Sequence, residues 1–196
     1  EKRRQPVVTA PTTVTAVPAR RRLVLWVAAG TGCVLAALVT AFAFVGPPPD
    51  TTQLLGRPAP AVAGSNLGGG GRPVSLRNYA GRWVLVDFAA SWCVPCQQEL
   101  PKLQAFARSA ARYHAALITV AESPSDGPAL ARYMSAHGAH WPAVQDPQAV
   151  VSYGVTGIPT VFLVDPDGII VGYYPSGVSP SGLDSFIRTA GASGVS

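Results

Sequence analysis

The chain has 196 residues, of which 48% are hydrophobic and only 13% charged, about half the charged share of an ordinary soluble domain. This composition excludes a wholly disordered chain, and three cysteines are too few for a small domain held together by disulfides. The net charge of +5 lies in residues 1–22, which carry six cations and one anion, because residues 46–196 carry nine of each. We therefore expect no nucleic-acid binding by the folded part.

Residues 23–45 contain no charged side chain and directly follow three arginines at positions 20–22. As a helix this run would measure about 34 Å, enough to cross a hydrocarbon core of ~30 Å. Cations collect on the cytoplasmic flank of such a segment, so we expect a single-pass signal anchor in the plasma membrane, in contact with membrane lipid. Residues 1–22 would form a disordered basic cytoplasmic tail, and the chain after residue 46 would lie on the outer face.

A cleaved signal peptide is one alternative, since a basic start followed by an apolar stretch describes both kinds of segment. The apolar core of a signal peptide is typically about 7–15 residues long, so the longer run here favours an uncleaved anchor. The segment Gly30-Thr31-Gly32-Cys33 also loosely resembles a lipobox, at which Cys33 would be lipidated. Because the apolar run continues beyond it, we expect Cys33 to be an inert thiol within the bilayer.

The rest of the chain predicts a stiff Pro-rich linker over residues 46–53 and one folded domain over residues 54–196. In chain order we expect a buried strand at 83–89, a helix at 93–113 interrupted by Pro101, a strand at 115–121, a helix at 127–137, two strands at 161–164 and 169–173 joined by a tight turn, and a helix at 180–189. This order predicts an α/β fold in which a mixed central sheet is covered by helices on both faces.

Cys93 and Cys96 are separated by two residues and stand where the strand at 83–89 gives way to a helix. At a helix N-terminus the unpaired N–H groups and the macrodipole lower the pKa of a thiol, and the thiolate is the attacking species. Cys96 lies one turn further along, close enough to form a disulfide, and we expect it to be the less accessible of the two. Pro95 falls in the first turn, where its missing N–H costs little. The spacing therefore predicts a redox dithiol.

Two other functions of this cysteine pair have to be weighed. Zinc also uses Cys-x-x-Cys pairs, but it needs two further ligands, and His137 and His140 belong to a separate helix and loop. A purely structural disulfide is the second alternative, although a four-residue loop restrains the unfolded chain very little. We therefore expect neither a metal nor another cofactor.

The residues around the cysteines resemble a known family. The stretch Val86-Asp87-Phe88-Ala89-Ala90-Ser91-Trp92-Cys93-Val94-Pro95-Cys96 is similar to the active-site segment of thioredoxin-fold proteins. Gly157-Ile158-Pro159-Thr160 resembles the cis-proline loop of that family. The segments 56–60, 74–82 and 99–101, together with an insertion over about 122–155, resemble the membrane-anchored TlpA/ResA branch. This resemblance covers roughly residues 54–190 and implies a thioredoxin fold.

The resemblance also implies a role for each matching residue. Cys93 would be the nucleophile and Cys96 the resolving thiol. Pro159 would follow a cis peptide bond and face the disulfide, while the backbone at Ile158 would pair with the substrate chain. Trp92 would shield one side of the two thiols.

Two carboxyl side chains are further candidates for proton transfer. Asp87 stands in an otherwise apolar strand, where a buried carboxylate is costly unless it is neutral or partnered. The resemblance to thioredoxin implies that Asp87 accepts the proton of Cys96; the alternative is an aspartate at the strand end that reaches solvent. Glu99, three residues beyond Cys96, would be a local acid–base group, or else a hydrogen-bond acceptor for nearby backbone.

These inferences lead us to expect a bacterial, extracytoplasmic, membrane-tethered thiol–disulfide oxidoreductase. The TlpA/ResA branch implies a membrane electron donor with reactive thiols, and clients such as the disulfide of apocytochrome c in cytochrome c maturation. A general disulfide oxidase or isomerase of secreted proteins is an alternative, as is a non-enzymatic metal-handling or adaptor domain. A peroxiredoxin is disfavoured, because Ala90-Ser91-Trp92 lacks the Pro-x-x-x-Thr/Ser approach to the peroxidatic cysteine.

Overall fold

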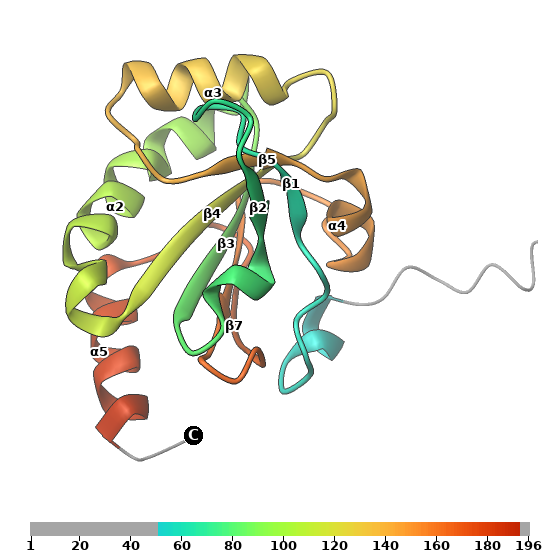
Figure 1. The fold of residues 1–196 in the computed structure, drawn as a ribbon. Coiled ribbons are helices and arrows are strands. Elements are labelled where there is room, and N and C mark those ends of the chain that lie inside the picture. Colours follow the sequence, from blue (N-terminus) through green and yellow to red (C-terminus); the bar gives the residue numbers. More distant parts are fainter. Residues whose placement is uncertain (1–50, 193–196) are drawn as a thin grey trace, which may run out of the picture. The chain divides into compact units, whose positions relative to one another are not determined.

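The computed structural model describes residues 51–192 (Figure 1). The expected tail, the apolar run with Cys33 and most of the linker lie outside these residues. None of the helices within 51–192 combines the length and the apolar character that a membrane span requires. The elements, in chain order, are η1 (Thr51–Leu54), β1 (Ala63–Ser65), β2 (Pro73–Ser75), η2 (Leu76–Tyr79), β3 (Trp83–Ala89), α2 (Val94–Ala110), η3 (Ala111–Tyr113), β4 (Ala115–Ala121), α3 (Gly127–Ala136), β5 (Ala143–Gln145), α4 (Pro147–Ser152), β6 (Thr160–Val164), β7 (Ile170–Tyr174) and α5 (Pro180–Ala192).

The central sheet has five strands in the order β5-β4-β3-β6-β7. β3 runs parallel to β4 and antiparallel to β6, so the sheet is mixed, as the sequence predicted. All seven residues of β3 are buried, which agrees with an apolar run in the middle of a sheet covered on both sides. The predicted hairpin is also present, because β6 and β7 pair as antiparallel neighbours.

Several short elements were not predicted. β5 has three residues and α4 has six, and neither is long enough to show a hydrophobic period against its neighbours. The same holds for the β1–β2 hairpin, whose strands have three residues each. The predicted helix at 93–113 ends earlier as an α-helix, at Ala110, and its last turn is the 3₁₀ helix η3.

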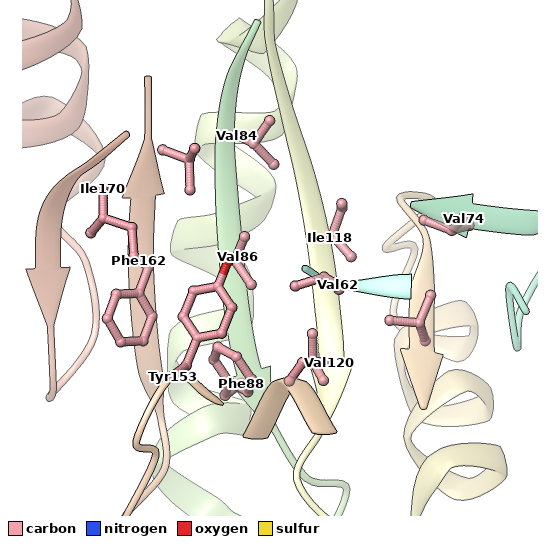
Figure 2. Packing of buried hydrophobic residues seen from close by; sticks show 13 residues of the cluster. Val62, Val74, Val84, Val86, Phe88, Ile118, Val120, Tyr153, Phe162 and Ile170 are labelled. Atoms are coloured by element: carbon pink, nitrogen blue, oxygen red, sulfur yellow. The ribbon is translucent and has the colours of Figure 1, made fainter. Parts of the chain in front are cut away.

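Helices cover both faces of the sheet, as expected. On one face, α2 and α5 contribute Leu103, Phe106 and Leu183 to a core that also contains Leu85 of β3. Leu130 and Met134 of α3 belong to a second buried cluster, which also contains Cys93 and Cys96. On the other face, α4 and the segments around β1 and β2 cover a core that contains Val84, Val86, Phe88, Ile118, Val120 and Phe162, and Tyr153 at the end of α4 packs into it (Figure 2). Side chains of β3 alternate between these cores, so Asp87 shares the α2 side with Leu85.

Candidate active site

Cys93 and Cys96 lie at the junction of β3 and α2 and form a disulfide with a sulfur–sulfur distance of 2.07 Å. Cys93 is the N-cap residue of α2, and its Sγ accepts a hydrogen bond of 3.2 Å from the backbone N–H of Cys96. Pro95 lies in the first turn, where the helix needs no backbone donor. Negative charge on Cys93 would therefore be stabilised by unpaired N–H groups at this helix end.

The expected difference in accessibility between the two cysteines is wrong for the disulfide form. Cys93 exposes 4% of its surface and Cys96 8%. Cys93 is covered because it belongs to the same buried cluster as Ala90 and Leu130, against which Ile158 packs. Trp92, in contrast, is 64% exposed. The structure thus leaves a large apolar side chain beside the disulfide open to an incoming partner.

Asp126, which the sequence analysis did not select, holds the loop that precedes Cys93. Its Oδ2 accepts the backbone N–H of Ser91 at 2.7 Å, and its Oδ1 accepts the Ser91 hydroxyl. The amide of Gln97 donates to the carbonyl oxygen of Ser91 at 2.7 Å. Ser91 is therefore attached both to the start of α3 and to the first turns of α2. Only the tertiary structure brings Asp126 here, 35 residues along the chain from Ser91.

The Ile158–Pro159 peptide bond is cis. Pro159 is buried and directly precedes β6, and Ile158 packs against the cluster that contains both cysteines. The loop is closed by the hydroxyl of Thr160, which donates to the carbonyl oxygen of Gly157 at 2.7 Å. The two segments that resemble thioredoxin-fold proteins are therefore brought together at one end of the sheet.

Asp87 is buried, with 3% of its surface exposed, so the alternative of a solvent-reaching aspartate is wrong. It pairs in register with Thr119 of β4, whose hydroxyl donates to Asp87 Oδ2 at 2.9 Å. The indole N–H of Trp141 donates in turn to Thr119 Oγ1 at 2.9 Å. Asp87 Oδ1 has no hydrogen-bond partner. Burial, with a smaller contribution from the charge of Glu99, raises the pKa of Asp87 from 3.8 to about 7, although the Thr119 hydrogen bond opposes this shift.

Glu99 is buried on α2, and its Oε1 accepts the backbone N–H of Val178 at 2.7 Å. The expected backbone hydrogen bond exists, but its donor lies 79 residues away. Gly177 has φ +94°, and a Cβ on it would lie 2.8 Å from Glu99 Oε1, so only glycine allows this approach. Glu99 Oε2 has no partner. Burial raises the pKa of Glu99, which the Val178 hydrogen bond partly offsets.

A small cavity lies between Asp87 and Cys96. It has a volume of about 20 Å³, and its lining includes Asp87, Cys96 and Thr119 together with apolar residues of α2 and α3. A cavity of this size and polarity can hold about one water molecule. Asp87 and Cys96 therefore border one cavity inside the core.

The site combines a disulfide at a helix N-terminus with a buried carboxyl group whose pKa is raised by burial to about 7. No group of three or more His, Cys, Asp or Glu side chains within 51–192 is placed to hold a metal ion. The thioredoxin-like fold and the Cys93–Cys96 pair define the class of the protein as a thiol–disulfide oxidoreductase.

Comparison with known proteins agrees with this class. A family model described as the AhpC/TSA family matches residues 55–173. A thiol-disulfide oxidoreductase ResA from Geobacillus thermodenitrificans is 30% identical over 121 residues, which are 60% of this chain and 67% of the relative. A thiol:disulfide interchange protein from Chlorobium tepidum has a TM-score of 0.58 and 27% identity, over 68% of this chain and 94% of the other. StoA from Bacillus subtilis has a TM-score of 0.54 and 26% identity, over 66% and 98%.

The chain belongs to the AhpC/TSA family, and its relatives include the ResA proteins that the sequence resembles. The expected fold family and enzyme class are thereby confirmed.

Proposed function

We propose that this protein is a membrane-tethered oxidoreductase that reduces client disulfides outside the cytoplasm. The observation that carries the proposal is the disulfide at the start of α2, which borders a small cavity together with a carboxyl group with a pKa of about 7. The relatives named thiol-disulfide oxidoreductase ResA support the exchange chemistry, and the resemblance of the sequence to the TlpA/ResA branch favours the reducing direction and a role in cytochrome c maturation. The uncharged run at residues 23–45 supports the tether.

The reaction starts from the reduced pair. The Cys93 thiolate attacks one sulfur of the client disulfide, whose S–S bond breaks; a mixed disulfide forms, and the other client sulfur leaves as a thiolate that takes up a proton. Cys96 then transfers its proton through the cavity to Asp87 and attacks Cys93 Sγ. The second client sulfur leaves as a thiolate that takes up a proton from the solvent, and Asp87 later returns its own proton to the solvent. The client has gained two electrons and two protons, and the enzyme holds the Cys93–Cys96 disulfide.

Other residues of the site bind and orient the client in this scheme. Trp92 is exposed beside the disulfide and offers an apolar contact surface. The backbone at Ile158, before Pro159, would pair with an extended client chain. A membrane protein with reactive thiols would then reduce the Cys93–Cys96 disulfide, which completes the cycle.

Trapping of the mixed disulfide tests this function. With Cys96→Ser the resolving thiol is lost while Cys93 keeps its place at the helix N-terminus, so a covalent, reductant-sensitive adduct should accumulate. Cys93→Ser should trap much less, because Cys96 lies one turn inside the helix. Cys33→Ser is the matched control and should change nothing. Equal trapping by the Cys93 and Cys96 variants would show that these roles are assigned wrongly.

The identity of the trapped clients decides between the specific and the general function. Adducts with proteins that carry a Cys-x-x-Cys-His haem-attachment motif would support cytochrome c maturation. A broad mixture of secreted proteins would favour a general oxidase or isomerase. Redox titration together with metal analysis distinguishes the proposed enzyme from a non-enzymatic metal-handling or adaptor domain. A stoichiometric metal without a redox couple would contradict the proposal.

The tether is tested by protease added to intact cells from which the wall has been removed. Digestion of residues 50–196, with the tail spared, is the expected result. Protection of the folded domain would contradict the proposed orientation.

A further inference from the structure

The surface of the domain is much more basic than its composition suggests. All nine cations within residues 51–192 are exposed. Of the eight acidic side chains in the same range, only Asp167 is exposed. The remaining acids are buried or half-buried, namely Asp87, Glu99, Glu122, Asp126, Asp146, Asp165 and Asp184. The sequence indicated a balanced charge for residues 46–196, but the balance does not hold at the surface.

The inward acids are used to hold loops. Asp146 accepts the N–H groups of Ala63 and Ala149. Asp165 accepts those of Asp167 and Ile169 within the β6–β7 turn. Arginine side chains are long, and their guanidinium groups remain hydrated when the stem packs. These acidic side chains therefore point inward to accept backbone hydrogen bonds, while the cationic side chains remain exposed to solvent.

Two of these arginines, Arg82 and Arg108, line one groove. This groove has a volume of about 580 Å³ and lies between the C-terminal half of α2, the start of β4 and the loop before β5. Arg82, Arg108 and His140 line it, and no carboxylate does. The Arg82 guanidinium is fixed by a hydrogen bond of 2.9 Å to the carbonyl oxygen of Ala115, and it stacks 5.6 Å from the ring centre of Tyr79. Tyr79 also lines the groove.

The arginine end of the groove lies far from the disulfide, while its other end reaches Trp141, which packs against the cluster that contains the cysteines. Cys93 caps the N-terminus of α2 and Arg108 stands in its last turn, so 15 residues of helix (93 to 108), about 22 Å, separate them. The chain also enters the domain at the arginine end. Gly56 donates to the carbonyl oxygen of Ile170, and Gly81, next to Arg82, donates to that of Pro166. In Figure 1, η1, η2 and the β6–β7 turn lie at the lower end of the domain, while α3 and the start of α2 lie at the upper end.

We propose that this basic groove binds the headgroups of anionic phospholipids in the membrane to which the chain is tethered. Basic residues near an anionic bilayer are attracted to it, and tyrosine is enriched at the level of the headgroups. Five residues, 46–50, separate the apolar run from the first described residue, and they reach at most about 18 Å. The inference rests on the membrane attachment proposed above. Its consequence is that the disulfide faces the aqueous compartment, where clients approach.

Arginine footprinting on the full chain tests the proposal. The protein is reconstituted in nanodiscs of phosphatidylcholine, with or without phosphatidylglycerol, and p-hydroxyphenylglyoxal modification is followed residue by residue with mass spectrometry. Arg82 and Arg108 should react about fivefold more slowly in the anionic discs, and high salt should remove the difference. Arg72, which is exposed but does not line the groove, is the internal control and should react equally in both. If Arg82 and Arg108 each react at the same rate in the two kinds of disc, the proposal is overturned. An acidic protein would then be the partner that fits the groove.

A pair of variants completes the test. Arg108→Gln should reduce the protection of Arg82 in anionic discs, whereas Arg72→Gln should not. Protection that survives Arg108→Gln unchanged would contradict a shared binding site. Flotation with vesicles of phosphatidylcholine alone measures membrane attachment through the anchor. Reduction of insulin disulfides measures the oxidoreductase activity. A chain that floats and reduces insulin, yet shows no lipid-dependent protection, would refute this inference without affecting the proposed function.

Discussion

Asp87 and Asp126 are both buried near the cysteines, but their oxygens have different partners. Both oxygens of Asp126 accept hydrogen bonds from Ser91. Asp87 receives one hydrogen bond, from Thr119, and its second oxygen has none. A carboxylate that accepts several hydrogen bonds is stable as an anion, whereas one left short of donors in an apolar region favours its protonated form. Asp126 is therefore suited to hold a loop and Asp87 to exchange a proton.

Glu99 has the same number of partners as Asp87. One of its oxygens accepts the Val178 N–H and holds the turn before α5, while the other is unpartnered. Its charge also contributes to the raised pKa of Asp87. The number of donors separates Asp126 from the other two side chains, since Asp87 and Glu99 each receive one hydrogen bond and keep one unpartnered oxygen. Asp87 and Glu99 differ in their donor, which is a side-chain hydroxyl for Asp87 and a backbone N–H for Glu99.

The largest expected effect comes from Asp87→Asn. The pKa of Asp87 rises from 3.8 to about 7 on folding, so the folded protein holds a proton in this range that the unfolded chain has lost. Stability should therefore decrease as pH rises from about 4 to about 7 and then level off. Asp87→Asn removes this penalty and should raise the free energy of unfolding at alkaline pH by up to about 4 kcal/mol.

Urea unfolding at acid and alkaline pH measures this effect, and turnover measures its functional counterpart. The variant should resolve the mixed disulfide about tenfold more slowly near neutral pH, because the base for Cys96 is missing. Asp167→Asn, at an exposed carboxylate, is the matched control. A stability difference that does not change with pH, together with normal kinetics, would assign Asp87 a structural role.

Asp126→Ala should have the opposite effect on stability. It removes two hydrogen bonds to Ser91 that involve a charged acceptor, and the expected loss is about 3 kcal/mol. Asp126→Asn keeps an acceptor and should recover part of it. The pH midpoint of turnover should not move, since no proton of the reaction passes through Asp126. A shifted pH midpoint of turnover with an unchanged free energy of unfolding would show that Asp126, like Asp87, takes part in proton transfer.

Thr119→Val deprives Asp87 of its only donor and leaves the Trp141 indole N–H without an acceptor. We expect the pKa of Asp87 to rise further and the fold to lose about 1–2 kcal/mol. Thr119→Ser retains the hydroxyl and is the control. The pH dependence of mixed-disulfide resolution, compared with urea unfolding, measures both changes. An unaltered pH profile would show that Thr119 does not tune Asp87.

Glu99→Gln should have the smallest effect. The glutamine carbonyl can still accept the Val178 N–H, so the turn should hold, but the negative charge near Asp87 is gone. Because that charge contributes to raising the pKa of Asp87, the titration of Asp87 in the variant should move to lower pH by less than about one pH unit. The NMR chemical shift of the Asp87 carboxyl carbon, followed against pH, measures this titration. A titration that moves to higher pH would mean that Glu99 acts on Asp87 in another way.

Much of the site could be predicted from local patterns. The apolar run at 83–89, the Cys-x-x-Cys pair after it and the position of Pro95 are properties of adjacent residues, and the structure has β3 and the start of α2 where they indicated. Asp87 stood out because one charge in a buried strand is unusual. The short strand β5 and helix α4 escaped prediction, since three to six residues do not define a period.

The amino-acid sequence by itself determined the α/β order, the redox pair and the presence of an acidic residue in the central strand. The tertiary structure decided which carboxyl groups have donors, because Ser91, Thr119 and Val178 reach their acceptors from 32 to 79 residues away along the chain. It also decided the surface charge. A formal count weighs every side chain equally, whereas folding buries the acids that accept backbone N–H groups and leaves the arginines in water.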